Sequence, residues 1–268
     1  MVQLIKEFIQ GKHPDQARCE DDYIIRDDYV AVIDGVSSKS TFTYQGQTTG
    51  KLASRLIKEA ISQLPKAADL EEILARINAV INQFYQEIAF DLDRKEFGLQ
   101  AVMALYSRHL GKIFLIGDCQ ARVNGRNYYQ PKRSDEVLSQ MRSLVLAIAA
   151  GPDEHQDQDL GREVILPWII QSTCFANQAE TPYGYAVING EDIPMSLIKS
   201  ISVKRGDRVT LTSDGYPDIK EDFSATEAYL QEILRQDPNL CRDFLSTKGL
   251  HSQYNSFDDR CYLEFIVT

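Results

Sequence analysis

Short apolar runs alternate with longer amphipathic stretches along the 268 residues of this chain. Many of the runs have the length of buried strands and come in pairs around polar turns, which predicts hairpins. The paired strands are expected at residues 23–26 and 29–33, at 99–106 and 112–116, and on either side of Asn124-Gly125. Further strands are expected at 183–188, 198–203, 208–211 and 261–267, with a turn at 204–207 joining the second and third of these.

Helical periodicity marks two adjacent stretches, 51–64 and 69–92, in which apolar residues recur on one face. Asp69, followed three residues later by Glu72, predicts the N-terminal cap of the second helix. Later helices are expected at 134–149, less clearly at 159–175, and from a capping box predicted at Ser224 and Glu227 to about residue 235.

Strands in hairpins and helices in adjacent pairs differ from the strict βαβ alternation of a parallel sheet. The pattern predicts an α+β fold, a four-layer αββα sandwich in which two mainly antiparallel β-sheets are flanked by helix pairs. Residues 1–268 contain no repeat and no linker-like segment, so one domain is expected. The polar stretch 151–182, interrupted by Pro152 and Pro167, is expected to be a flap or insertion.

The composition is that of an ordinary soluble globular protein, with 43% hydrophobic and 25% charged residues. A net charge of −10 argues against nucleic-acid partners and against docking on an anionic membrane. No apolar stretch has the length of a membrane span, and no signal peptide is recognisable. The five cysteines form no CxxC pair, which fits a reducing, cytoplasmic location. The oligomeric state is left open by the sequence.

Four acidic fragments, at residues 19–22, 32–35, 212–215 and 257–260, lie far apart in the chain and next to predicted strands. Any one of them fits a turn or a solvated loop, but together they place carboxylates at several strand ends. Gathered carboxylates repel one another and are costly to desolvate, and we expect no matching cluster of Lys or Arg beside them. A hard divalent cation, which prefers oxygen ligands, is the natural neutraliser.

The sequence therefore predicts an oxygen-ligand metal centre. Asp34 ends a predicted strand and is suited to bridge two cations, and the Gly35 carbonyl can approach one of them closely. Two Mg²⁺ or Mn²⁺ ions about 3.5–4 Å apart would clamp a phosphoryl group and acidify a bridging water. No nucleophile elbow and no phosphate-binding P-loop offers a rival chemistry.

In order and rough spacing, the motifs resemble those of the metal-dependent protein phosphatases of type 2C. The resemblance covers nearly the whole chain and rests on Glu20-Asp21, residues 32–35, residues 117–122, residues 213–218 and Asp258-Asp259-Arg260. It implies a metal-dependent phosphomonoester hydrolase, a serine/threonine protein phosphatase that uses a metal-bridging hydroxide. It also implies two or three Mn²⁺ or Mg²⁺ ions and a phosphorylated protein as substrate.

The same resemblance implies a role for each acidic position. One ion would be held by Glu20, Asp34 and the Gly35 carbonyl, and the other by Asp34, Asp214 and Asp258. Asp21 would accept a hydrogen bond from water bound to the metal, and Asp118 and Asp218 match positions that hold a third ion in bacterial members.

The chain departs from the family pattern on the substrate side. Gln16 stands where many members carry an Arg that grips phosphate, which makes Arg18, two residues further on, a candidate substrate-binding residue. His13, near the first motif, is a candidate general acid. Two other functions stay open: a phosphatase of a small phosphorylated metabolite, and a catalytically weak metal-binding signalling module.

Overall fold

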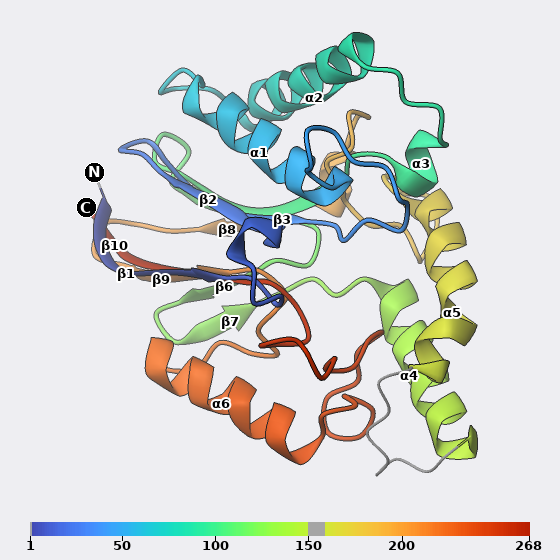
Figure 1. Cartoon of the computed structure of the whole chain (residues 1–268). Helices are drawn as coiled ribbons and strands as arrows, with labels where there is room; N and C mark the ends of the chain where they lie inside the picture. The colour runs from blue at the N-terminus through green and yellow to red at the C-terminus, as the bar shows by residue number, and fades with distance from the viewer. Residues whose placement is uncertain (1, 150–158) are drawn as a thin grey trace.

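The computed structural model describes residues 2–149 and 159–268, and over these ranges it contains two five-stranded antiparallel sheets (Figure 1). One sheet has the order β1 (Val2–Gln10), β10 (Arg260–Val267), β9 (Arg208–Thr212), β6 (Gln120–Val123), β7 (Arg126–Tyr128). The other has the order β2 (Asp22–Ile25), β3 (Tyr29–Gly35), β4 (Ala101–Ser107), β5 (Lys112–Ile116), β8 (Lys199–Ser202).

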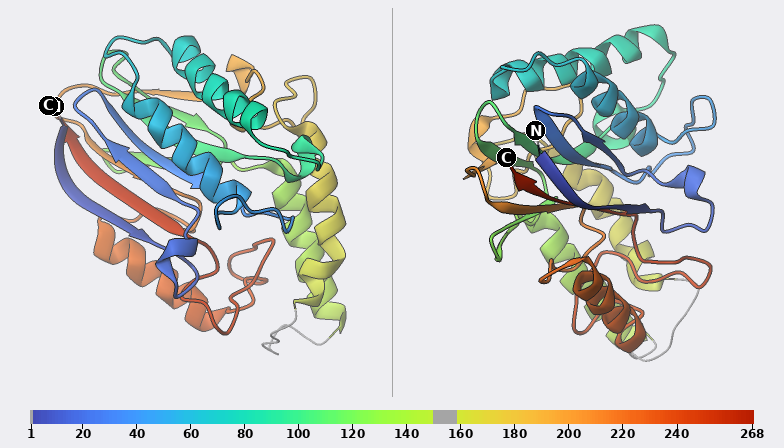
Figure 2. Two further views of the ribbon diagram at one scale, coloured as in Figure 1. Left: turned by 45° about the horizontal axis from the view of Figure 1, so that its top comes forward. Right: turned by 90° about the vertical axis from the view of Figure 1, so that its left-hand side faces the viewer.

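The helices are arranged in layers on and beside these sheets (Figures 1 and 2). Helices α1 (Thr49–Ser62) and α2 (Leu70–Glu87) cover the outer face of the β3 sheet, and α6 (Phe223–Gln236) covers the outer face of the β10 sheet. The short α3 (Arg94–Phe97) precedes β4, and the pair α4 (Arg133–Ala149) and α5 (Leu160–Gln171) stands at one end of the sandwich.

Alternating side chains explain the layering, because successive residues of a strand point to opposite faces. On β3, Val30 and Val32 pack between the sheets, against residues such as Leu263 on β10. Ala31 and Ile33 point the other way and pack under α1 and α2. Both faces of this strand are buried, which is why its sequence is a continuous apolar run.

The predicted α+β sandwich of two antiparallel sheets is confirmed, and so are the predicted hairpins and the α1–α2 pair. Three details differ. Strand β1, which pairs with β10, was not predicted. Residues 183–188 were predicted to be a strand but form only isolated bridges. Strands β8 and β9 are joined by the turn at 204–207 but belong to different sheets.

The predicted capping box at Ser224 is wrong by two residues. The N-cap of α6 is Asp222, whose side chain accepts a hydrogen bond from the Ala225 amide at 2.9 Å. Glu227 is drawn away from the helix terminus, because its carboxylate accepts hydrogen bonds from Tyr216 and Arg260. Tertiary partners therefore override the local signal at this helix start.

Replacement of this cap should cost more stability than replacement of the residue predicted to be the cap. We expect Asp222→Ala to lower the free energy of unfolding by about 1 kcal/mol, the usual effect of losing an N-cap acceptor. Ser224→Ala is the matched control, because Ser224 is exposed and lies two residues after the cap. It should lower the free energy of unfolding by less than half as much. Urea unfolding of the two variants measures the difference, and equal losses would contradict the assignment.

Helices α4 and α5 pack through Leu138, Ile165 and Ile169 and are tied to the rest of the chain by Arg142. This guanidinium is 1% exposed, lies 2.8 Å from the Asp159 carboxylate, and donates to the Leu240 carbonyl. Part of the predicted flap, residues 151–158, lies outside the described residues; the remainder includes α5. In the described ranges, no helix combines the length and the apolarity that crossing a bilayer would need.

Candidate metal centre

The acidic residues predicted from separate motifs meet at the end of the sandwich opposite the two chain termini (Figure 1). Asp34 is the penultimate residue of β3, Asp118 follows β5, Asp214 follows β9 and Asp258 precedes β10. All four line a single cavity of about 160 Å³. Antiparallel neighbours bring the end of one strand beside the start of the next, which is why such distant sequence positions converge.

Close backbone packing fixes the segments that carry these side chains. A Cβ on Gly35 would come within 2.3 Å of the Gly50 carbonyl oxygen and 2.7 Å of the Glu20 carbonyl oxygen, so only glycine fits there. Asp259, 3% exposed, accepts hydrogen bonds from the amides of Lys12 at 2.7 Å and Glu20 at 3.0 Å. The Glu20 segment is thus held between β3, α1 and the start of β10.

Three carboxyls of the cavity, Asp34, Asp118 and Asp214, have pKa values above the ordinary range. Burial is the main cause for each, and the negative charge of neighbouring carboxylates adds to it. The pKa of Asp214 is raised to about 7, and its side chain shares a hydrogen bond with Asp34. Two buried carboxylates close enough to share a hydrogen bond need a proton or a cation between them.

Asp21 lies behind this group and adds to its negative charge. The side chain is buried, and its Oδ2 atom has no hydrogen-bond partner in the structure. Burial first, and then the charge of Asp259, raise the pKa of the Asp21 carboxyl. An unpartnered carboxylate oxygen in such a position is a site for a water or a cation.

Asp258 differs from the other cavity carboxyls because it is paired with lysines. Its burial would raise the pKa, but the ammonium groups of Lys12 and Lys248 outweigh burial and lower the pKa of Asp258. The Lys12 ammonium lies 2.9 Å from Asp258 and 3.6 Å from Glu20. The expectation that no basic residues stand beside the acidic fragments is therefore wrong.

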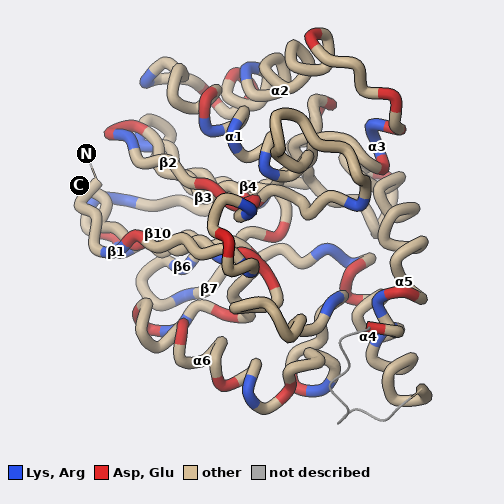
Figure 3. The backbone as a smooth tube through the Cα atoms, in the orientation of Figure 1, with Lys and Arg blue, Asp and Glu red and all other residues tan. Residues whose placement is uncertain are grey.

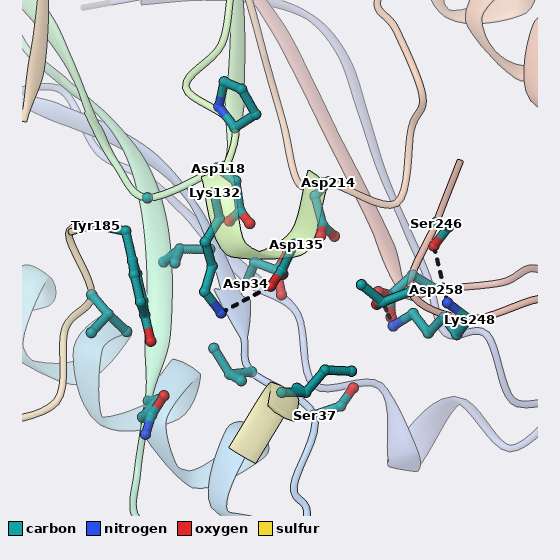
Figure 4. Close-up of a pocket in the computed structure, with 18 of the residues that line it drawn as sticks. Asp34, Ser37, Asp118, Lys132, Asp135, Tyr185, Asp214, Ser246, Lys248 and Asp258 are labelled. Carbon is teal, nitrogen blue, oxygen red and sulfur yellow. Dashed lines mark hydrogen bonds and ion pairs between the residues drawn. The ribbon is translucent and has the colours of Figure 1, made fainter. Parts of the chain in front are cut away.

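Further basic residues face the cavity from the side of α4 and α5, where Figure 3 shows acidic and basic stretches of the backbone next to one another. Lys39, Lys132 and Arg162 line the cavity together with Asp135 on α4. Lys132 lies 3.4 Å from Asp135 and 4.4 Å from the centre of the Tyr185 ring. In Figure 4 the carboxylates of Asp34, Asp118, Asp135 and Asp214 are grouped, and Asp258 lies apart beside Lys248.

Sequence reasoning missed Asp135, Lys132 and Arg162, all of which belong to the α4–α5 segment. The sequence signal was a run of charged residues, 132–136, at the start of a predicted helix. Such a run usually marks a solvated helix terminus. Only the packing of α4 and α5 across the strand ends turns these residues toward the carboxylates.

Six predicted residues do not line the cavity: Glu20, Asp21 and Gly35, which lie in the segments around it, and Asp218, Arg18 and His13. The Asp218 carboxylate accepts hydrogen bonds from Asn127 and from Lys220, the latter at 2.7 Å. Arg18 is exposed on the 3₁₀ turn Gln16–Arg18, and its guanidinium lies 2.9 Å from Nε2 of His13. The structure thus brings Asp118 toward Asp34 and Asp214 and leaves Asp218, Arg18 and His13 outside.

The donor set of the cavity fits a hard divalent cation. It consists of carboxylate oxygens, and the shared hydrogen bond of Asp34 with Asp214 marks a place that a cation would neutralise. In the ranges 2–149 and 159–268, no three Asp, Glu, His or Cys side chains converge closely enough to ligate one ion. Mg²⁺ is usually held by one or two carboxylates and several waters, so two facing aspartates suffice for it.

The sequence matches no protein-family model and no curated protein. The structure is similar to that of the serine/threonine phosphatase PstP/Ppp of Mycobacterium tuberculosis, with a TM-score of 0.51 and 16% sequence identity over 100% of this chain and 99% of that chain. This likeness shows the fold, and it agrees with the fold implied by the resemblance to type 2C phosphatases.

Two further structures give lower TM-scores. A catalytic domain of PstP in complex with two manganese ions has a TM-score of 0.49 at 17% identity, covering 100% of both chains. PppA of Pseudomonas aeruginosa, a regulatory component of a secretion system, has a TM-score of 0.48 at 14% identity, covering 98% of this chain and 96% of that chain.

Proposed function

We propose that this protein is a metal-dependent phosphomonoester hydrolase whose substrate is a phosphoserine or phosphothreonine of a protein. The observation that carries the proposal is the cavity in which Asp34, Asp118 and Asp214, from three strand ends, face Lys39, Lys132 and Arg162. Carboxylates on one wall suit divalent cations, and the cations of the other wall suit phosphate oxygens. A protein that only bound metal would have no need of this second wall.

In this proposal Asp34 and Asp214, with Asp118 beside them, hold Mn²⁺ or Mg²⁺. When bound, the divalent metal supplies neutralising charge for the phosphoryl oxygens and acidifies a water. In this proposal the buried Asp21, whose Oδ2 has no hydrogen-bond partner among the described residues, would orient a water beside the metal ligands. His13 lies outside the cavity, next to Arg18, so the cavity itself gives no support to a general-acid role for it.

The basic wall would bind the phosphate dianion. Burial, and then the neighbouring cations Lys132, Arg162 and Lys248, lower the pKa of Lys39 to about 7. Within the described residues, no carboxylate lies at ion-pair distance from the Lys39 ammonium. A buried lysine that is crowded by other cations and has no carboxylate partner is stabilised by an incoming dianion, which gives this wall a preference for phosphate over neutral groups.

A second cavity favours a protein substrate over a small metabolite. It measures about 470 Å³ and shares Asp118, Asp135 and Asp214 with the first, so the two are neighbours across these carboxylates. Its remaining lining includes Phe244 and Leu245, the latter 37% exposed. The small cavity fits a phosphorylated side chain, and the larger, partly apolar one fits the flanking peptide.

Arg162 should contribute more to phosphate binding than Arg18. We expect Arg162→Ala to raise KM for an aryl phosphate roughly tenfold, since a hydrogen bond to a charged group contributes about 1.5 kcal/mol. Arg18→Ala tests the role predicted from sequence in the same assay; exposed and outside the cavity, it should change KM less than twofold. A larger KM effect from Arg18→Ala would return the phosphate-binding role to that residue.

A substrate panel tests the proposed function. Phosphoserine and phosphothreonine peptides, sugar phosphates and nucleotide monophosphates would be compared by kcat/KM with Mn²⁺ present. We expect the phosphopeptides to be preferred and the preference to depend on the residues flanking the phosphate. Preference for a sugar or nucleotide phosphate would favour the metabolite phosphatase, and no turnover of any substrate would favour the signalling module.

A further inference from the structure

Two of the predicted metal ligands, Glu20 and Asp258, already share a cation that belongs to the chain. The Lys12 ammonium lies 2.9 Å from Oδ1 of Asp258, 3.5 Å from Oδ2 of Asp259 and 3.6 Å from Oε2 of Glu20. It also donates a hydrogen bond to Oγ of Ser37 at 2.7 Å. Three carboxylates at ion-pair distance and a hydroxyl at hydrogen-bond distance thus surround one ammonium group.

The carboxylate oxygens of these two ligands are all engaged. Oε1 of Glu20 accepts a hydrogen bond from the Thr48 hydroxyl at 2.5 Å, and Oε2 faces Lys12. In Asp258, Oδ1 accepts from Lys12 and Oδ2 accepts from Lys248. A divalent ion could use either carboxylate only by displacing an ammonium group or a hydroxyl.

Lys12 is not a surface lysine that happens to reach the site. Its side chain is 17% exposed, its amide donates to Asp259 at 2.7 Å, and its carbonyl accepts from the Asn255 amide at 2.7 Å. These backbone contacts hold the residue directly after β1, at the entrance to the Glu20 segment. The ammonium is therefore placed by the fold and not only by attraction to the carboxylates.

Among the described residues, the aspartates of the other half of the centre are not paired with a lysine in this way. In the part of the chain that the structure describes, no lysine or arginine lies within ion-pair distance of Asp34, Asp118 or Asp214. Asp34 and Asp214 share a hydrogen bond with each other instead. Figure 4 shows Lys248 beside Asp258, whereas the lysine drawn near the other aspartates, Lys132, pairs with Asp135.

We propose that Lys12 permanently supplies the cation on the Glu20 and Asp258 side of this centre, in place of a divalent ion bound to either carboxylate. Divalent ions then bind only at the Asp34, Asp118 and Asp214 side, and Glu20 and Asp258 serve to hold Lys12. An ammonium supplies positive charge to the site but cannot expand its coordination or exchange with solvent, so this half of the centre needs no dissolved metal. The inference rests on the proposed metal centre, but metal position can be measured without any assay of phosphatase activity.

Crystals of the unmodified protein grown with Mn²⁺ provide the test, because anomalous scattering locates manganese directly. We expect a peak beside Asp34 and Asp214, none between Glu20 and Asp258, and Nζ of Lys12 still between those two carboxylates. A peak bonded to Glu20 with Lys12 displaced would overturn the inference and leave the proposed function standing. No peak at any of these aspartates would overturn both.

Metal stoichiometry in solution provides the second measurement. Lys12→Met removes the ammonium that faces Glu20 Oε2 and Asp258 Oδ1, so calorimetric titration with Mn²⁺ should find one more bound ion per chain than in the unmodified protein. Lys58→Met is the matched control: Lys58 pairs with Asp22 at 2.7 Å, outside the cavity, and its removal should leave the number unchanged. Equal numbers of ions in the Lys12→Met variant and the unmodified protein would contradict the proposal.

Discussion

Removal of divalent metal is expected to lower turnover of an aryl phosphate at least roughly 100-fold. The carboxylates of Asp34, Asp118 and Asp214 face one another in a cavity, and no ammonium lies within ion-pair distance of them in the described ranges. Without a cation they would repel the phosphate dianion that the basic wall attracts. Loss of several kcal/mol of charge stabilisation in the transition state corresponds to this factor or more.

The measurement is kcat with excess chelator, then with Mn²⁺ or Mg²⁺ restored. Turnover should return with either ion, because both accept oxygen ligands. Added Mn²⁺ should also raise the melting temperature, since a ligand that binds only the folded chain stabilises it by about 2.7 kcal/mol at 100 times its Kd. Undiminished turnover in excess chelator, with metal content checked as absent, would rule out the metal-dependent mechanism.

Local sequence patterns were sufficient to predict most strands and helices of the sandwich. The run at 29–33 and the turn at Asp27-Asp28 predicted the β2–β3 hairpin, and Asp69 is the N-cap of α2 as expected. Strand β1 was not predicted because Lys6 and Glu7 interrupt its apolar alternation. A bulge between Leu4 and Lys6 also shifts its register. This strand pairs with β10, a contact of long sequence separation that no local window contains.

Because β1 was not predicted, Lys12 was not recognised as a residue of the site. Lys12 follows that strand, so without the strand nothing placed its ammonium at the end of the sandwich beside Asp258 and Asp259. Acidic positions were predictable because they lie in motifs at strand ends. Their basic partners were not predictable, because Lys132 lies directly before α4 and Arg162 lies on α5, and tertiary packing decides how these two helices are oriented.

Asp34→Asn is expected to lower kcat for an aryl phosphate by roughly 10² or more, the scale of removing one strong electrostatic contributor to a transition state. Asparagine keeps the shape of the side chain but removes its charge. Asp34 lies on β3, lines the cavity and shares a hydrogen bond with Asp214, so its carboxylate serves the proposed cation position directly. The matched control is Asp27→Asn, an exposed turn carboxylate on the same hairpin, which should leave kcat unchanged.

Stability separates loss of chemistry from loss of fold in this variant. The pKa of Asp34 is raised in the folded protein by burial and by neighbouring carboxylates, so its charged form opposes folding above the ordinary Asp pKa when no cation is bound. Near neutral pH and in chelator, Asp34→Asn should therefore melt no lower than the unmodified protein, while losing most of the stabilisation by Mn²⁺. Near-native kcat in Asp34→Asn, or a kcat loss in Asp27→Asn as large as the one expected here, would show that a different carboxylate carries the metal.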